Sequence, residues 1–393
     1  QAEAQGRDAV ARFLAARSAA SEAHVHQPQP LLPEHRARRV LFFESLMNTD
    51  MPHNDTELSQ GVLHMASALQ ETGAEVVFAN VKMPITGVQR PIAGLDTVKG
   101  ALERGPVDLV CITLLEGYFE GVVRLIAELR GLGCTAHIAV GGVMPTLAPE
   151  HVAAHLRDVT FVCRGAGEYH LPRLVHLVGR RGFQAPLDQA QRDALIAMDG
   201  LFAVDRAGGA LVAGNPGRTV KVEDLDRVAL DLRFLKAHHL ERGVELSTSR
   251  GCIHKCAFCS IIGRQSYQAR SAGGVLELLG KYQERYAELF GDEIPRNAFR
   301  VHLSDDDFAC DRERARTFFV ELLQTPFRLA SAQVSVADLC RRDGNNLLPE
   351  IDYELVDAIR PECFADSSAT FPERDFVADH KSRRWSSYLQ IGV

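Results

Sequence analysis

Short apolar runs alternate with amphipathic helices from about residue 37 to residue 182, and this alternation most strongly constrains the fold. The apolar runs are continuous, which is typical of strands that are buried on both faces of a parallel sheet. The sequence therefore predicts a doubly wound, Rossmann-like α/β domain, whose ligand would bind at the carboxyl ends of the strands. We expect strands at residues 40–43, 75–80, 108–113, 136–140 and 159–162.

Three cysteines are concentrated in one short segment farther along the chain. Cys252, Cys256 and Cys259 are spaced C-x3-C-x2-C. Three thiolates so close together can ligate three irons of a cubane cluster, which leaves the fourth iron without a protein ligand. A zinc site that includes His254 is the alternative, but structural zinc sites usually use two separated ligand pairs, and no second pair lies nearby. The spacing favours a [4Fe-4S] cluster with one iron open to a substrate or co-substrate.

With Phe258 directly before the last cysteine, this segment resembles the cluster loop of the radical S-adenosylmethionine (SAM) superfamily. The resemblance implies a partial (β/α)6 barrel, similar to a TIM barrel, in which SAM binds the open iron and is cleaved to a 5′-deoxyadenosyl radical. Chemistry in such a barrel takes place at the carboxyl ends of the strands. The resemblance also implies that SAM is contacted by Phe258, Ser304, Asp306 and Arg270.

Two glycine-containing loops, residues 141–150 and 164–168, follow consecutive predicted strands of the first domain. They resemble corrin-binding loops of the cobalamin (B12)-binding domain that precedes the barrel in cobalamin-dependent radical SAM enzymes. Tight turns between strand and helix would also explain the glycines. The resemblance implies that cobalamin is contacted by Thr113, Leu114, Leu115, Glu116, Gly141, Gly142, Val143, Thr146, Gly165, Gly167 and Glu168.

The loop after the first strand departs from the pattern of base-off cobalamin proteins. Those proteins carry a D-x-H-x-x-G motif, in which the histidine is the lower axial ligand of cobalt. Here Asp50 and His53 are three residues apart and no glycine follows at the required position. We therefore do not expect His53 to bind cobalt, and the lower axial ligand stays open.

Three adjacent carboxylates, Asp305, Asp306 and Asp307, follow the second predicted strand of the barrel. Successive side chains point in different directions, so we do not expect all three to bind one metal ion. A solvated acidic loop that caps the next helix is the alternative to a contact with SAM. Cys310, Cys340 and Cys363 also lie in the barrel half, and one of them is a candidate hydrogen donor or radical relay.

The expected domain order is an N-terminal helix or linker, a cobalamin-binding domain, a connector with a β-hairpin, and the barrel. A complete partial barrel has six strand–helix units, and we expect only four strands before the end of the sequence. We therefore expect further residues after Val393. The expected boundaries are 1–36, 37–182, 183–243 and 244–393. Residues 244–251 are expected to form a strand that runs into a loop, and the further barrel strands are expected at 299–303, 327–334 and 388–393.

The resemblance implies a methyltransferase that methylates an unactivated carbon through a 5′-deoxyadenosyl radical and methylcobalamin. It would act on a small-molecule or peptide substrate with an external electron donor of the flavodoxin or ferredoxin type. The alternatives are a cyclisation or rearrangement without methylation, a methylthiotransferase, and a non-catalytic cobalamin or redox sensor. A methylthiotransferase would need three cysteines in strand-end loops, whereas Cys111 lies inside a predicted strand and Cys134 precedes one.

Composition argues against two other classes of protein. The net charge of −7 and the pI near 6.1 give no electrostatic reason to expect nucleic acid as a partner. No apolar run reaches the length of about 18 residues that a membrane span needs. Nine cysteines without paired spacing, and no visible signal peptide, indicate a reducing compartment and a cytoplasmic location.

Overall fold

The chain divides into two compact units, which we call unit 1 (Gln1–Glu223 and Ala229–Asp231) and unit 2 (Asp224–Val228 and Leu232–Val393). Most of the predicted N-terminal segment, His53 and Phe258 lie outside the described residues. The computed structural model describes residues 23–24, 39–44, 58–179, 187–205, 209–214, 219–220, 224–254, 256, 259, 267–341, 350–365 and 388–392.

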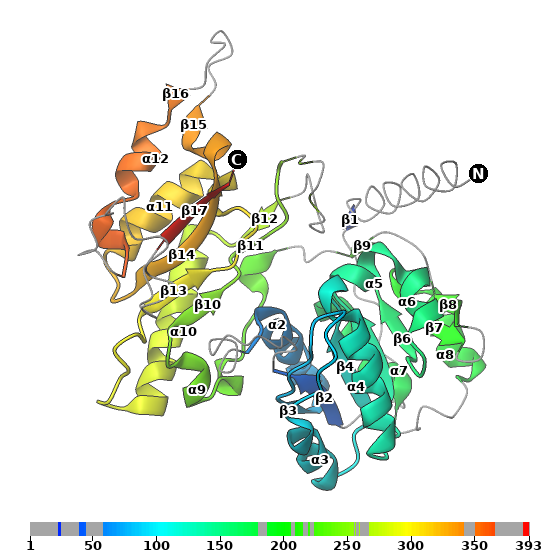
Figure 1. The fold of residues 1–393 in the computed structure, drawn as a ribbon. Coiled ribbons are helices and arrows are strands. Elements are labelled where there is room, and N and C mark those ends of the chain that lie inside the picture. The colour runs from blue at the N-terminus through cyan, green and yellow to red at the C-terminus, as the bar shows by residue number, and fades with distance from the viewer. Residues whose placement is uncertain are drawn as a thin grey trace. The chain divides into compact units, whose positions relative to one another are not determined.

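Unit 1 is built on a seven-stranded sheet of order β3-β2-β4-β5-β6-β7-β8 (Figure 1). The first five strands in this order are parallel, which confirms the predicted doubly wound domain. The strands are β2 (Arg39–Phe43), β3 (Glu75–Ala79), β4 (Leu109–Thr113), β5 (His137–Gly141), β6 (Phe161–Cys163), β7 (Leu201–Asp205) and β8 (Ala210–Gly214).

The predicted hairpin of the connector is formed by β7 and β8, and it belongs to this sheet. β7 pairs antiparallel with β6, so the hairpin extends the parallel sheet at one edge. Before β7, the carbonyl of Gly200 accepts a hydrogen bond of 2.7 Å from the amide of Arg164. A short parallel pair of β1 (Ala23–His24) and β9 (Thr219–Val220) completes the described strands of unit 1.

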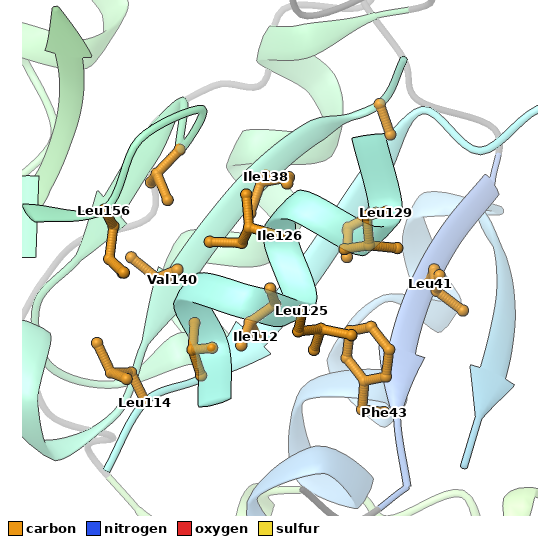
Figure 2. Packing of buried hydrophobic residues seen from close by; sticks show 14 of the residues in the cluster. Leu41, Phe43, Ile112, Leu114, Leu125, Ile126, Leu129, Ile138, Val140 and Leu156 are labelled. Carbon is orange, nitrogen blue, oxygen red and sulfur yellow. The ribbon is translucent and has the colours of Figure 1, made fainter. Parts of the chain in front are cut away.

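Helix α4 (Phe119–Gly131) shows how the core of unit 1 follows from the sequence. Its apolar residues recur at the spacing of one helix face, and that face is buried against the sheet. Figure 2 shows Leu125, Ile126 and Leu129 of this helix packed over Ile112 of β4 and Ile138 of β5. Burying each such side chain contributes about 1.5–3 kcal/mol. The other helices of unit 1 are α2 (Gln60–Ala68), α3 (Leu95–Glu103), α5 (Val143–Leu147), α6 (Pro149–His155), α7 (Gly167–Val178) and α8 (Gln189–Ile196), with the 3-10 turns η1 (Gln70–Thr72) and η2 (Glu116–Tyr118).

Unit 2 has a four-stranded parallel sheet in which the strands follow one another in sequence order. This order is that of successive strand–helix units in a (β/α) barrel, as expected. The strands are β10 (Val244–Leu246), β13 (Arg300–Leu303), β14 (Arg328–Ser335) and β17 (Tyr388–Gly392), and the two short antiparallel pairs are β11 (Ser249–Arg250) with β12 (Gln268–Ala269) and β15 (Cys340–Arg341) with β16 (Glu350–Ile351).

Helices connect the strands of unit 2, and the longest of them follows the cysteine segment. The helices and 3-10 turns are α9 (Ala237–Leu240), α10 (Ala272–Phe290), α11 (Arg312–Leu322), α12 (Tyr353–Ala358), η3 (Leu225–Arg227), η4 (Leu232–Phe234), η5 (Phe308–Cys310), η6 (Val336–Leu339) and η7 (Pro361–Cys363). In the part of the chain that the structure describes, no helix combines the length and the apolar character that a membrane crossing needs.

Residues 244–251, predicted as a strand that runs into a loop, form β10 and, after two further residues, the short strand β11. Between them lies Thr248, whose hydroxyl donates hydrogen bonds of 3.0 Å to the carboxylate of Asp305, beyond the end of β13. This buried side-chain contact joins the segment just before the cysteines to the residues that follow β13.

Candidate functional site

In unit 1, the loops after β4 and β5 are joined directly by backbone hydrogen bonds. The amide of Leu114 donates to the carbonyl of Gly141 at 2.8 Å, and the amide of Met144 donates to the carbonyl of Leu114 at 3.3 Å. The strand-end residues that were predicted in separate loops therefore lie along one edge of the sheet, where open α/β sheets bind their ligands.

Thr146 joins the loop after β6 to the same edge. Its buried hydroxyl donates to the carbonyl of Gly142 at 2.6 Å and accepts from the amide of Gly165 at 3.1 Å. The guanidinium of Arg164 donates to the carbonyl of Thr146 at 3.2 Å. Because its hydroxyl both donates to and accepts from backbone groups, Thr146 connects the loop after β5 to the loop after β6.

Glycine is required at different positions of this edge for different structural reasons. Gly142 has a φ of 101°, and an added Cβ would lie 3.1 Å from Cγ2 of Thr113. At Gly167, a Cβ would lie 2.6 Å from the sulfur of Met65 on α2, so this glycine permits close packing of α7. A Cβ on Gly141 would meet nothing closer than 3.7 Å. Packing thus accounts for Gly142 and Gly167, whereas Gly141 leaves partly exposed backbone free for a ligand to approach.

Leu115 and Glu116 project from the end of β4 into solvent. The side chain of Leu115 is 37% exposed, and Glu116 is exposed as well. Glu168 is held differently, because its carboxylate lies 3.5 Å from Nδ1 of the buried His64 on α2. An exposed leucine beside accessible glycine backbone is a surface that suits a large, mostly apolar ring system.

In unit 2, the cysteine loop begins directly after β11. Cys252 is 9% exposed, and Cys256 and Cys259 are partly buried. The sulfur of Cys252 accepts a hydrogen bond of 3.4 Å from the amide of His254, and the amide of Cys259 donates to the carbonyl of Cys256 at 3.2 Å. Burial raises the pKa of the Cys252 thiol, and the amide of His254 opposes this shift because it stabilises the thiolate.

A buried polar network fastens the start of this loop. Asp305, which is 2% exposed, accepts hydrogen bonds from the hydroxyls of Thr248 and Ser249. The guanidinium of Arg314 on α11 donates to the Thr248 hydroxyl and, at 3.0 Å, to the hydroxyl of Tyr267. Burial raises the pKa of Asp305, and Ser249 and Arg314 oppose that shift. The network ties both ends of the loop to the ends of β10 and β13.

The residues that follow β13 alternate between the interior and solvent. Asp305 and Asp307 are buried, whereas Ser304 and Asp306 are exposed. The Ser304 hydroxyl donates to the carbonyl of Leu246 at 3.2 Å, so it lies where β10 ends. Ser304 and Asp306, two of the four residues predicted to contact SAM, therefore have side chains that a ligand above the strand ends can reach.

Arg270, which was also predicted to contact SAM, is buried at the base of the loop. Its guanidinium donates to the carbonyl of Val228 at 2.8 Å, and burial lowers its pKa against the opposing effect of Asp226. These contacts anchor residues 224–228 to unit 2. A contact between Arg270 and SAM stays a prediction.

One group of side chains next to the cysteine loop was not predicted from the sequence. Nε2 of His254 lies 3.0 Å from Oδ2 of Asp338 and 3.3 Å from Oδ2 of Asp307. Asp338 lies in η6, directly after β14, so its position after a predicted parallel strand was the available signal. The carboxyl ends of neighbouring parallel strands meet at one edge of a sheet.

Comparison with known proteins bears on both edges. Residues 57–175 match the family model of the B12 binding domain. The match contains the loops after β4, β5 and β6 that the structure brings together, and it confirms the predicted domain type. A search of curated proteins found no match.

Solved structures extend the similarity to both units. OxsB, a cobalamin-dependent SAM radical enzyme, was solved with aqua-cobalamin and SAM bound. It aligns with 91% of this chain and 44% of its own chain, at a TM-score of 0.57 and 16% identity. TsrM from Kitasatospora setae, a radical SAM methyltransferase solved with cobalamin and a [4Fe-4S] cluster, aligns with 84% of this chain and 59% of its own, at a TM-score of 0.54 and 16% identity. The chain thus spans about half the length of these enzymes. Their shared fold confirms the resemblance at the level of architecture.

Proposed function

We propose that this chain is part of a cobalamin-dependent radical SAM enzyme, with a [4Fe-4S] cluster on Cys252, Cys256 and Cys259. The observation that carries the proposal is the position of the cysteine loop. It starts at the carboxyl end of the first strand of a parallel sheet, and the exposed Ser304 and Asp306 follow the next strand. The same chain contains a B12-binding domain.

The residues at the edge of unit 1 fit a corrin in two different ways. Thr113, Leu115, Glu116, Gly141 and Val143 are partly or fully exposed, so they would contact cobalamin directly. The buried residues of the predicted set would act by holding the loops in place, as the hydrogen bonds of Thr146 do. These buried residues are Leu114 and Thr146.

The side chains of unit 2 would hold the cluster and orient SAM. When bound, the cluster with SAM supplies a 5′-deoxyadenosyl radical, and cobalamin supplies a methyl group for an unactivated carbon. The amide of His254 would stabilise the Cys252 thiolate, and the Asp305–Arg314 network would keep the loop in register with the strand ends. Ser304 and Asp306 would position the polar groups of SAM.

Two further features belong to the proposal. The substrate would be a small molecule or a peptide, and an external protein of the flavodoxin or ferredoxin type would supply electrons. Methylation, rather than cyclisation or rearrangement, is supported by the shared fold with TsrM, which is a methyltransferase. Cys111, Cys134 and Cys163 are all buried in unit 1, which disfavours a methylthiotransferase with a second cluster there.

Anaerobic turnover tests the proposal. The full-length protein would be reconstituted with iron, sulfide and cobalamin and then incubated with SAM and a reductant, with Cys256→Ala as the matched control. We expect 5′-deoxyadenosine and S-adenosylhomocysteine from the wild type and neither from the variant. 5′-Deoxyadenosine alone would favour a reaction without methylation. A protein that holds cluster and corrin but forms neither product would contradict the proposal and favour a sensor.

A further inference from the structure

A second set of metal-ligating side chains lies beside the cysteine loop. Asp307, Cys310 and Asp338 offer two carboxylate oxygens and a thiol sulfur that all lie within 4.8 Å of one another. The imidazole of His254 adjoins both carboxylates, at 3.0 Å and 3.3 Å. Separate segments of unit 2 supply these groups: the cysteine loop, the turn after β13, and the turn after β14. The fold thus brings four ligand side chains to one point.

The two carboxylates are buried side by side, which is unfavourable without a compensating charge. Asp307 and Asp338 are each 3% exposed. In the described part of the chain, His254 is the basic side chain that pairs with both carboxylates, and no lysine or arginine does so. Buried carboxylates in proteins are normally paired with a cation or coordinate a metal.

We propose that His254, Asp307, Cys310 and Asp338 bind one divalent transition-metal ion of the Zn2+ or Fe2+ class. Imidazole and thiolate ligands suit these borderline ions and disfavour Mg2+ and Ca2+, which require oxygen ligands. Metal–ligand bonds of about 2.0–2.3 Å place tetrahedral ligand atoms about 3.3–3.8 Å apart. The ligand atoms of Asp307, Cys310 and Asp338 therefore have to close by at most about 1–1.5 Å around the ion, whereas Nε2 of His254 already lies 3.0 Å and 3.3 Å from the two carboxylates.

This site adjoins the proposed cluster, because the sulfur of Cys252 lies within 4.8 Å of the ligand atoms of His254 and Asp307. In this proposal Cys252 serves the cluster and Cys310 serves the second ion. The ion would connect His254, which lies between Cys252 and Cys256 in the sequence, to the ends of β13 and β14. Its role is to fix the cysteine loop on the sheet, and its binding does not depend on the proposed reaction.

The test uses a full-length variant that cannot hold the cluster, with Cys252, Cys256 and Cys259 all replaced by alanine. Anaerobic titration with Co2+ reports thiolate ligation as a charge-transfer band and tetrahedral geometry as intense visible bands. We expect one equivalent of Co2+ to bind. Adding Cys310→Ser should remove the charge-transfer band and weaken Co2+ binding at least tenfold. Adding Asp338→Asn should weaken binding similarly but keep the band. Cys340→Ser, at a partly buried cysteine outside the site, is the matched control and should change neither.

Two outcomes would overturn the proposal. The first is that the triple variant is folded, as judged by its circular dichroism, but binds no Co2+. The second is that Cys310→Ser leaves the Co2+ spectrum of the triple variant unchanged. If the triple variant does not fold, metal analysis of the cluster-loaded wild type decides instead. One zinc or iron in excess of the cluster iron, lost in Cys310→Ser while cluster absorbance remains, supports the site. Equal metal content in both proteins refutes it. A wild type that lacks a cluster would contradict the proposed function and leave the Co2+ result standing.

Discussion

In each unit the carboxyl ends of the parallel strands form one edge of the sheet, and different chemical groups line this edge in the two units. In unit 1, backbone groups of Leu114, Gly141 and Met144 form the edge, and the main side-chain contribution is one buried hydroxyl, that of Thr146. In unit 2, the corresponding edge is crowded with thiols, carboxylates and a buried guanidinium. Parallel sheets can therefore present either an accessible backbone or a set of ionisable side chains at the same topological position.

The difference corresponds to the ligands that we assign to the two edges. A corrin is large and rigid, so it needs glycine backbone that it can approach closely. A cluster and SAM are held through a few strong bonds, so they need thiolates and polar groups fixed in position. Substitutions at the two edges should consequently have different effects on ligand binding and stability.

Cys256→Ala should have the largest effect of any single substitution at either edge. Cys256 is only partly buried, so its loss should remove a cluster ligand without disturbing the core. We expect cluster iron and its visible absorbance to fall to background, while cobalamin binding at the edge of unit 1 stays within about twofold. Iron analysis and corrin absorbance measure the two effects, and Cys340→Ser should change neither. Retention of a full cluster in Cys256→Ala would show that the loop has been assigned wrongly.

Arg314→Met tests whether the side-chain network fixes the edge of unit 2. The substitution removes the guanidinium donor to the buried Thr248 and to Tyr267 and the positive charge that opposes the raised pKa of Asp305. Each buried acceptor that loses its donor costs about 1–3 kcal/mol. Chemical denaturation should show this loss for unit 2.

Arg316→Met, on the exposed side of the same helix, is the matched control. Arg316 forms an exposed ion pair with Glu313, and such pairs contribute at most about 1 kcal/mol. Equal destabilisation by the two substitutions would mean that the network does not carry the stability of this edge.

Gly142→Ala tests the backbone character of the edge of unit 1. At a φ of 101°, alanine is strained, and its Cβ would lie 3.1–3.2 Å from Thr113 and Leu114. Strain of this kind costs about 1–3 kcal/mol, which corresponds to a loss of roughly 5- to 150-fold in corrin affinity if the loop shifts to relieve it. Absorbance titration with cobalamin measures the change. Gly117→Ala is the control, because a Cβ there meets nothing within 4 Å, and an equal loss in that variant would argue against the assignment.

Local patterns in the sequence were sufficient to predict most strands and the cysteine loop. Continuous apolar runs identify buried strands. The cysteine motif lies within one short segment, so it can be recognised without knowledge of distant contacts. The pairing of the β7–β8 hairpin with β6 could not be read in this way, because a strand pattern does not name its partner.

The contacts of His254 and Arg314 could not be predicted from local sequence patterns, for a different reason. They depend on which side chains of distant segments point inward at a strand end. That direction depends on the register of β13 and β14, which shifts at Val301 and His302. One residue of shift reverses the side-chain direction, and the sequence does not show where the shift occurs.

The smallest expected effect is at His302. A substitution there tests whether the polar character of the unit 2 edge continues into the body of its sheet. Its Nδ1 lies 3.0 Å from the hydroxyl of Ser331 on β14. Burial, with a contribution from Arg300, lowers the pKa of His302 to about 4, below the ordinary value of 6.5. Between these two values, the unfolded chain binds more protons than the folded chain. The contribution of His302 to stability is therefore fully present above pH 6.5 and is lost as the pH falls toward 4.

The slope for one such group is at most about 1.4 kcal/mol per pH unit, and we expect about half of that, because His302 is only partly buried. Chemical denaturation of the wild type and of His302→Asn at about pH 7 and about pH 5 measures it. Asparagine keeps a polar partner for Ser331 but does not titrate, so the variant should lose less stability than the wild type over this range. Parallel losses in both proteins would show that the strand interior of unit 2 does not contribute to its acid sensitivity, and that the ionisable groups at the strand ends are responsible.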